Sequence, residues 1–262
     1  MKKIVISILL VLGISLLIFS KKTFQKEKIS STQNAKIITE QILENTNHDI
    51  EVKFPQFYGL TENSDKIIND IIKDGIYDFI EVKKSDMILY NLYLRLDYKI
   101  EYLNDNFISI AYSGIWIPAT DNIGFRGGDE FYTINIDIMQ GKVIQLNDFL
   151  VDTNKIYDLL EQDKFECINP PENIKENGLF SRYSNTSRNM IKEEISSDIT
   201  KESNQRRVQW YVTGNALVLC ISENRYLHKY SVSLDEVKEF LNADIMSKIK
   251  DLEPTAAKLT IK

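Results

Sequence analysis

The sequence predicts an α+β fold: an antiparallel sheet meander with helices packed against it, preceded by one N-terminal hydrophobic membrane helix. Three observations lead to this prediction. Segments with a period of two, typical of half-buried strands, come in groups along the chain. Segments with a period near 3.6, typical of helices, stand between and after those groups. An uncharged, mostly apolar run lies at the N-terminus.

The N-terminal run follows Met1-Lys2-Lys3 and extends over residues 4–20 without a charge. A helix that spans a membrane needs about 17–25 such residues, so this run reaches the lower limit. No small-x-small cleavage motif follows it. We therefore expect an uncleaved signal-anchor over residues 1–22, a polar tether over 23–34, and an exported domain over 35–262. The alternatives are a cleaved signal peptide and a buried helix of a soluble protein.

The exported part begins with three predicted elements. Residues 35–45 are expected to form a helix, because their isoleucines and Leu43 fall on one helical stripe. Residues 51–57 alternate and contain Pro55, which is typical of a short or edge strand. The next helix is capped by Asn63 or Ser64 and has a period near 3.6. Its apolar positions are Ile67, Ile68, Ile71, Ile72, Ile76 and Phe79.

The period then changes to two. Residues 92–102 alternate between apolar side chains and mostly charged ones, as a half-buried antiparallel strand requires. Strands over 107–117, 131–139 and 142–146 follow, and Gln140-Gly141 supplies the last turn. These strands make the predicted meander.

The second half is predicted to contain a helical region that starts at Asn147 or Asp148, and a polar helix over 182–200. Strands over 208–212 and 216–221 are joined by a hairpin signal, and a last strand holds Tyr230 and Val232. Ser233 and Glu236 form a capping box that starts a helix reaching Ile249. The exported chain is one domain or two sub-domains, about 35–120 and 121–250.

Composition excludes several function classes. The chain has 32 Lys and Arg against 38 Asp and Glu, a net charge of −6, so we expect no nucleic-acid partner. Its two cysteines and two histidines lie at no zinc-ligand spacing from one another. A nucleophile elbow, a P-loop, a dinucleotide fingerprint and a zinc-protease motif are all missing from the sequence. We therefore expect a non-enzymatic protein with no cofactor and no metal.

The candidate ligand-binding residues surround one predicted loop. Asp129 and Glu130 are adjacent carboxylates that could bind a cation or a basic partner, although charged loop residues usually face water. Trp116 precedes Pro118 at the mouth of the same loop, where an aromatic side chain can anchor a ligand. The alternative for Trp116 is a core or cross-strand contact.

Two further residues, Cys167 and Cys220, could form one disulfide outside the cell. The alternative is a buried free thiol at Cys220, because this cysteine stands in an apolar strand.

Several segments resemble the RsiV-type extracytoplasmic domain, which also occurs before the catalytic domain of PdaC-type peptidoglycan deacetylases. Residues 137–150 are similar to its strand–turn–strand–helix signature, and residues 210–219 to its late hairpin. Residues 231–237 resemble its closing strand and helix. Residues 54–57 and the helix containing Asn69 resemble its N-terminal half.

The resemblance implies an exported α+β module behind a membrane segment. In RsiV-like members this module binds lysozyme, and binding triggers proteolysis of an anti-sigma factor. Three residues precede the hydrophobic run here, so we do not expect this chain to control a sigma factor. The family's Gly-Ala-His loop corresponds to residues 127–130, which contain no His, so a role of that His does not transfer. We also do not expect the deacetylase activity, because the Asp/His metal cluster that it needs is missing from these residues.

These observations together predict a single-pass protein of the cell membrane whose domain lies on the extracytoplasmic side. Its expected function is that of a non-catalytic binding or sensing module for lysozyme or another cell-wall ligand. Acidic charge favours such a cationic partner. The alternatives are a structural accessory subunit of a membrane complex and a cell-wall hydrolase. The abundance of Ile, Lys and Asn favours a Gram-positive source.

Overall fold

The structure is a computed structural model, and it describes residues 26–32, 35–45, 49–60, 64–90, 92–118, 127–169, 180, 183–196, 208–223 and 226–250. The predicted membrane segment, residues 1–22, lies outside the described residues. Across those ranges, the structure contains no helix with both the length and the apolar character that a membrane crossing requires.

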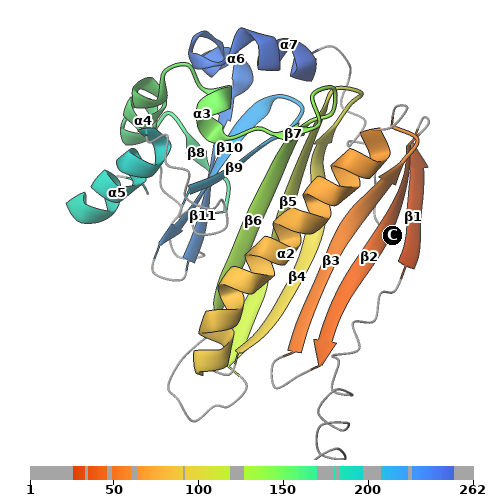
Figure 1. The fold of residues 1–262 in the computed structure, drawn as a ribbon. Helices are drawn as coiled ribbons and strands as arrows, with labels where there is room; N and C mark the ends of the chain where they lie inside the picture. Colours follow the sequence, from red (N-terminus) through yellow and green to blue (C-terminus); the bar gives the residue numbers. More distant parts are fainter. Residues whose placement is uncertain are drawn as a thin grey trace, which may run out of the picture.

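The larger of two sheets has seven strands in chain order (Figure 1). They are β1 (Lys26–Thr32), β2 (Ala35–Asn45), β3 (Asp49–Tyr58), β4 (Leu92–Leu103), β5 (Phe107–Pro118), β6 (Gly128–Asp137) and β7 (Lys142–Val143). The long helix α2 (Ser64–Tyr90) crosses one face of this sheet. The predicted mixture of helices with largely antiparallel strands is therefore confirmed.

The first predicted helix is wrong, because residues 35–45 form strand β2. This strand pairs with β3 over ten positions and with β1 on its other side. Ile37 and Thr39 are buried, and further along Ile42 and Glu44 are buried. These two alternating stretches are out of phase by one residue, which imitates a helical stripe. Part of the predicted tether also differs, because residues 26–32 form β1.

The seven-stranded sheet is not a pure meander. Helix α2 connects β3 to β4, and these two strands are parallel, as a crossover connection requires. Their pairing covers only residues 50–52 of β3, which is an interior strand and not the predicted edge strand. Pro55 lies beyond this paired part, where its missing N–H costs no bond to β4.

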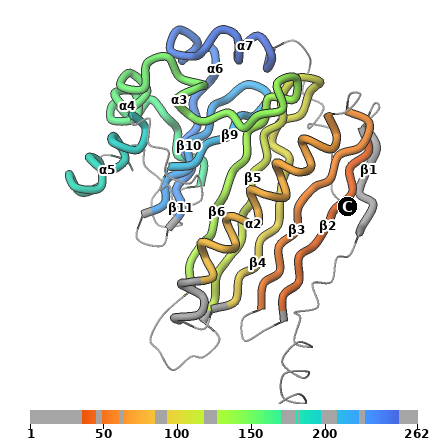
Figure 2. The backbone as a smooth tube through the Cα atoms, in the orientation of Figure 1, coloured from red at the N-terminus to blue at the C-terminus, as the bar shows by residue number. Residues whose placement is uncertain are grey.

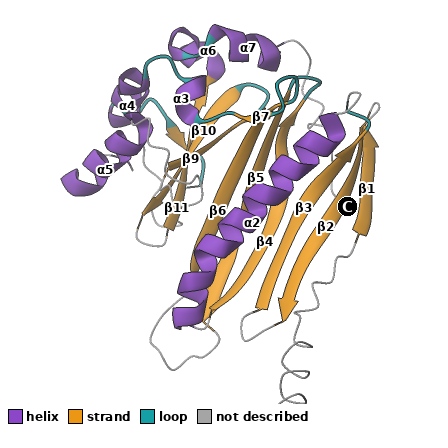
Figure 3. Cartoon of the chain, viewed as in Figure 1, coloured by secondary structure: helices purple, strands orange, loops and turns teal. Residues whose placement is uncertain are grey.

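The smaller sheet has four strands in the order β8-β11-β10-β9. They are β8 (Glu166–Cys167), β9 (Val208–Val212), β10 (Ala216–Glu223) and β11 (Tyr226–Ser233). The short helices α3 (Leu146–Phe149), α4 (Thr153–Glu161), α5 (Asn185–Ser196), α6 (Leu234–Val237) and α7 (Ala243–Lys250) belong to this half of the molecule (Figure 3).

The predicted C-terminal helix is interrupted. A 3-10 turn (Lys238–Phe240) follows α6, and Leu241 is extended, with φ −102° and ψ 148°. Leu241 forms an isolated bridge to Leu150, so backbone pairing with a distant segment ends the helix there. Ser233 caps α6, but its hydroxyl accepts from the Asp235 N–H and not from Glu236, so the predicted capping box is not formed.

The layers are stacked around β5 and β6. One apolar core fills the space between α2 and the seven-stranded sheet, and a second lies between the four-stranded sheet and its helices. A small third cluster, which includes Ala111, Tyr211 and Cys220, joins the two sheets face to face. β6 and β9, far apart in sequence, consequently run side by side (Figure 2).

Candidate functional site

The three predicted ligand-binding residues lie at one end of the β5–β6 pair, where Trp116 is opposite Gly128 and Ile115 opposite Asp129. The predicted loop around Asp129 and Glu130 is in fact the start of strand β6. Successive strand residues point to opposite faces, so the two carboxylates diverge. Asp129 is exposed, whereas Glu130 is 11% exposed and binds Lys83 of α2 at 2.7 Å.

Trp116 is partly buried and packs on the core beneath α2. Its indole lies directly over Gly128, where an added Cβ would stand 2.9 Å from the ring. The structure therefore gives Trp116 a cross-strand contact. It does not bring Trp116, Asp129 and Glu130 together as one cluster.

The two cysteines are free, and the fold keeps them apart. Cys167 is opposite Tyr230 and Cys220 is opposite Lys229, on the two sides of β11. β8 and β10 are separated by β11, so their backbones lie about 9.5 Å apart. A disulfide requires two Cα atoms within about 7 Å of each other. Because Tyr230 and Lys229 are neighbours, the cysteines also face opposite sides of the sheet. The predicted disulfide is not formed, and the alternative of a buried thiol at Cys220 describes the structure.

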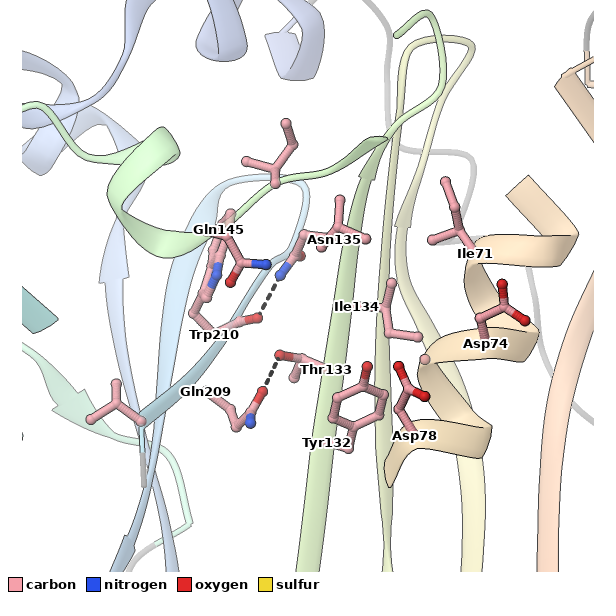
Figure 4. Close-up of a pocket in the computed structure, with 14 residues that line it drawn as sticks. Ile71, Asp74, Asp78, Tyr132, Thr133, Ile134, Asn135, Gln145, Gln209 and Trp210 are labelled. Carbon is pink, nitrogen blue, oxygen red and sulfur yellow. Dashed lines mark hydrogen bonds between the residues drawn. The ribbon is translucent and has the colours of Figure 1, made fainter. Parts of the chain in front are cut away.

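A groove of about 350 Å³ lies where α2, β6 and β9 meet. Figure 4 shows Asp74 and Asp78 of α2 on one side of β6, and Gln145, Gln209 and Trp210 on the other. The wall on the α2 side carries the two carboxylates. Neutral side chains and backbone form the opposite wall.

The outer edge of β6 runs along this groove, and no described segment pairs with most of its length. β7 pairs only with Ile136 and Asp137, and the Ile144 N–H adds one bond to the Asn135 carbonyl. The N–H and C=O groups of alternate strand residues point to the same edge. Those of Thr133 and Phe131 therefore also point outward, and no described segment bonds to them.

Hydrogen bonds of buried polar side chains hold β9 against β6 at the back of the groove. Asn135 is 2% exposed, and its amide donates to the Trp210 carbonyl at 2.8 Å. Its side-chain oxygen accepts from the Ser109 hydroxyl at 2.5 Å, and that hydroxyl accepts from the Val212 N–H at 3.1 Å. The Thr133 hydroxyl donates to Gln209 at 2.9 Å. Two strands that cannot pair directly are thus joined by side chains.

The wall formed by α2 is acidic and packs against side chains of the sheet at Gly75. Asp74 and Asp78 are exposed, and no other residue that lines the groove in the described part of the chain is charged. Gly75 lies between them, and a Cβ there would stand 2.8 Å from the Tyr132 hydroxyl. Glycine inside a helix costs up to about 1 kcal/mol relative to alanine. This cost is consistent with a close approach that brings the carboxylates beside the β6 edge.

A second hollow, of about 370 Å³, lies under α7 at the other end of β6. Its buried carboxylate, Asp137, is 1% exposed and forms an ion pair with Lys248. The Asn104 amide and the Tyr102 hydroxyl donate to the carbonyls of Lys248 and Ile249. These bonds satisfy the last carbonyls of α7, so the polar groups here hold the helix in place.

Sequence reasoning missed the groove. Thr133 and Asn135 alternate with Ile134 and Ile136 in the buried part of β6, residues 132–137, which signals a covered but polar face. A glycine inside an otherwise regular helix, here Gly75, was a second available signal. Within the described part of the chain, no group of three or more His, Cys, Asp or Glu is placed to hold a metal ion.

No family model and no curated protein matches the chain. Solved structures that are similar to it include two DUF3298 family proteins. One is a DUF3298 family protein from Pseudomonas aeruginosa PAO1, with 11% identity and a TM-score of 0.46 over 86% of this chain and 95% of that one. The other is a member of the DUF3298 family from Bacteroides fragilis NCTC 9343, with 10% identity and a TM-score of 0.46 over 89% of this chain and 100% of that one. These neighbours belong to a family of unknown function, and the resemblance to the RsiV type stays a prediction.

Proposed function

We propose that this protein is a membrane-anchored, extracytoplasmic binding module that recognises a cationic protein of the cell-wall environment, with lysozyme as the first candidate. The observation that carries the proposal is the groove beside β6, where the carboxylates Asp74 and Asp78 are the only charged side chains among the described lining residues. Like charges one helical turn apart repel each other, so a cation bound between them relieves that repulsion.

Two other features support this ligand. The net charge of −6 steers cationic proteins toward the chain. The resemblance of the sequence to the RsiV-type domain, whose RsiV-like members bind lysozyme, supports the same ligand independently of charge. By contrast, Asp129 and Glu130, the carboxylates considered for a wall hydrolase, point to opposite faces of the sheet. Glycoside hydrolysis needs two carboxylates that flank one bond, and this pair does not provide them.

The test is binding of lysozyme to the full chain in detergent, measured by interferometry at about 0.02 M and about 0.3 M salt. We expect saturable binding that weakens at the higher salt and inhibits the hydrolase. Asp74→Asn combined with Asp78→Asn should weaken it, whereas Asp105→Asn combined with Asp163→Asn, an equal change in charge at two exposed positions outside the groove, should not. The absence of binding at low salt would refute lysozyme as the ligand.

A further inference from the structure

The open edge of β6 offers an unused set of hydrogen-bonding groups beside an acidic wall. Thr133 and Phe131 each present one N–H and one C=O outward, and no described segment bonds to them. Long unpaired edges are normally shortened, charged or covered, because they accept foreign strands. Here, as far as the structure describes the chain, the edge stays open over several residues and is recessed between α2 and β9.

We propose that this edge binds an extended lysine- or arginine-bearing peptide segment of a partner protein as an additional strand. The segment would lie in the groove, hydrogen-bonded to Thr133 and Phe131, with its basic side chains over Asp74 and Asp78. The inference rests on the proposed function in one respect, the cationic nature of the ligand. It adds the mode of recognition and the sequence pattern that the ligand must have.

The spacing of the two carboxylates fits a strand. Residues four apart in a helix are separated by about 6 Å along its axis. Side chains on one face of a strand recur about every 6.6 Å. Basic residues at alternate positions of the added strand therefore match Asp74 and Asp78 one to one. This match explains why the acidic pair stands at this helical spacing beside this edge.

The face of the added strand that points away from α2 would lie in an environment without the acidic pair. Its side chains point toward the four-stranded sheet, where Gln209 is bonded to Thr133. Nearby, the Lys229 ammonium lies 4.7 Å from the centre of the Phe131 ring. A cation on this face would meet another cation, so the basic residues must all be on the α2 side. The ligand pattern is an alternation of basic and uncharged residues.

The probe is a synthetic pentapeptide, acetyl-Lys-Val-Lys-Val-Lys-amide, added to the full chain in detergent. Binding is measured by fluorescence anisotropy of a labelled copy, and amide hydrogen exchange is followed over residues 128–135. We expect saturable binding and slower exchange in that segment. Asp74→Asn with Asp78→Asn should weaken binding about 2- to 30-fold, since exposed ion pairs each contribute modestly. Asp105→Asn with Asp163→Asn, which removes the same charge at exposed positions outside the groove, should leave it unchanged.

Backbone methylation decides whether the peptide adds as a strand. In an antiparallel addition the valine N–H groups point to β6, and in a parallel addition the lysine N–H groups do. Methylation of one set should abolish binding, while methylation of the other set should leave it intact. Equal effects of the two methylated peptides, or unchanged exchange over 128–135, would overturn the proposal.

Lysozyme is measured on the same preparation, so that the two ideas can fail separately. Peptide binding that obeys the methylation rule supports strand addition, even where lysozyme does not bind and the first candidate ligand is lost. Lysozyme binding with no response to the peptide refutes strand addition and leaves the proposed function standing.

Discussion

Asn69 on α2 replaces a missing strand partner of β3, and its removal tests how the sheet is held where β3 diverges from β4. The Phe57 N–H donates to the Asn69 side-chain oxygen at 2.8 Å, and the Asn69 amide donates to the Phe57 carbonyl at 2.8 Å. Phe57 has no exposed surface. Asn69→Ala would leave both backbone groups without partners in a buried strand.

The expected loss follows from these two bonds. Each buried polar group left without a partner costs about 1–3 kcal/mol. We take about 1–2 kcal/mol for each of the two Phe57 backbone groups, so their combined cost is about 2–4 kcal/mol. Alanine is a better helix former than asparagine by up to about 0.7 kcal/mol, which offsets part of the loss. The net decrease in the free energy of unfolding is therefore about 1.5–3.5 kcal/mol.

Urea unfolding followed by circular dichroism measures this decrease for Asn69→Ala. With an m-value of about 3 kcal/mol per molar, the midpoint should fall by about 0.5–1.2 M. Asp70→Ala is the matched control, because Asp70 is the next residue of the same helix and is exposed. Its effect should stay below about 0.5 kcal/mol. Equal midpoints for the two variants would refute the role assigned to Asn69.

Three further predictions concern buried groups. Tyr112 is fully buried and its hydroxyl has no hydrogen-bond partner in the described part of the chain, so Tyr112→Phe should leave the thermal midpoint unchanged or raise it. Asp137→Ala leaves the partly buried Lys248 without its ion-pair partner and should lower stability by about 3–5 kcal/mol, measured by urea unfolding. Burial raises the pKa of the Cys167 and Cys220 thiols, so the native chain should label slowly at pH 8, with Cys220 protected until unfolding. Unfolded thiols ionise near pH 9.0 while the folded ones stay protonated, so stability should also fall as the pH rises past that value.

The parts of the fold that depend on local pattern could be predicted from the sequence. Strict alternation over 92–102 predicts β4 because one of its faces is apolar and the other charged. The hairpin at Thr213-Gly214-Asn215 is set by local chemistry, and the Thr213 N–H does donate to the Ala216 carbonyl at 2.9 Å. Such elements are specified within a few residues of the chain.

Other parts depend on partners that are distant in the sequence. β2 looked helical because its burial pattern changes phase, and only pairing with β3 shows that it is a strand. The last helix is interrupted at Leu241 because this residue forms a β-bridge to Leu150, which lies 91 residues earlier in the chain. The site has the same origin, since Asp74 and Thr133 become neighbours of one groove only through the α2 crossover.

The open edge itself follows from where the chain goes after β6. Gly141, with φ +59°, turns the chain back, and β7 pairs for two residues. Further pairing would keep the next residues beside β6. Instead, the buried side chains of Leu146, Phe149 and Leu150 pack into the core of the four-stranded sheet, where Phe149 stacks on Trp210 at 4.7 Å. Burial of these side chains outweighs the few additional strand bonds. The segment that anchors the second sheet therefore does not cover the β6 edge, and the acidic pair on α2 stands beside it, which is the arrangement on which the proposed binding of a cationic segment depends.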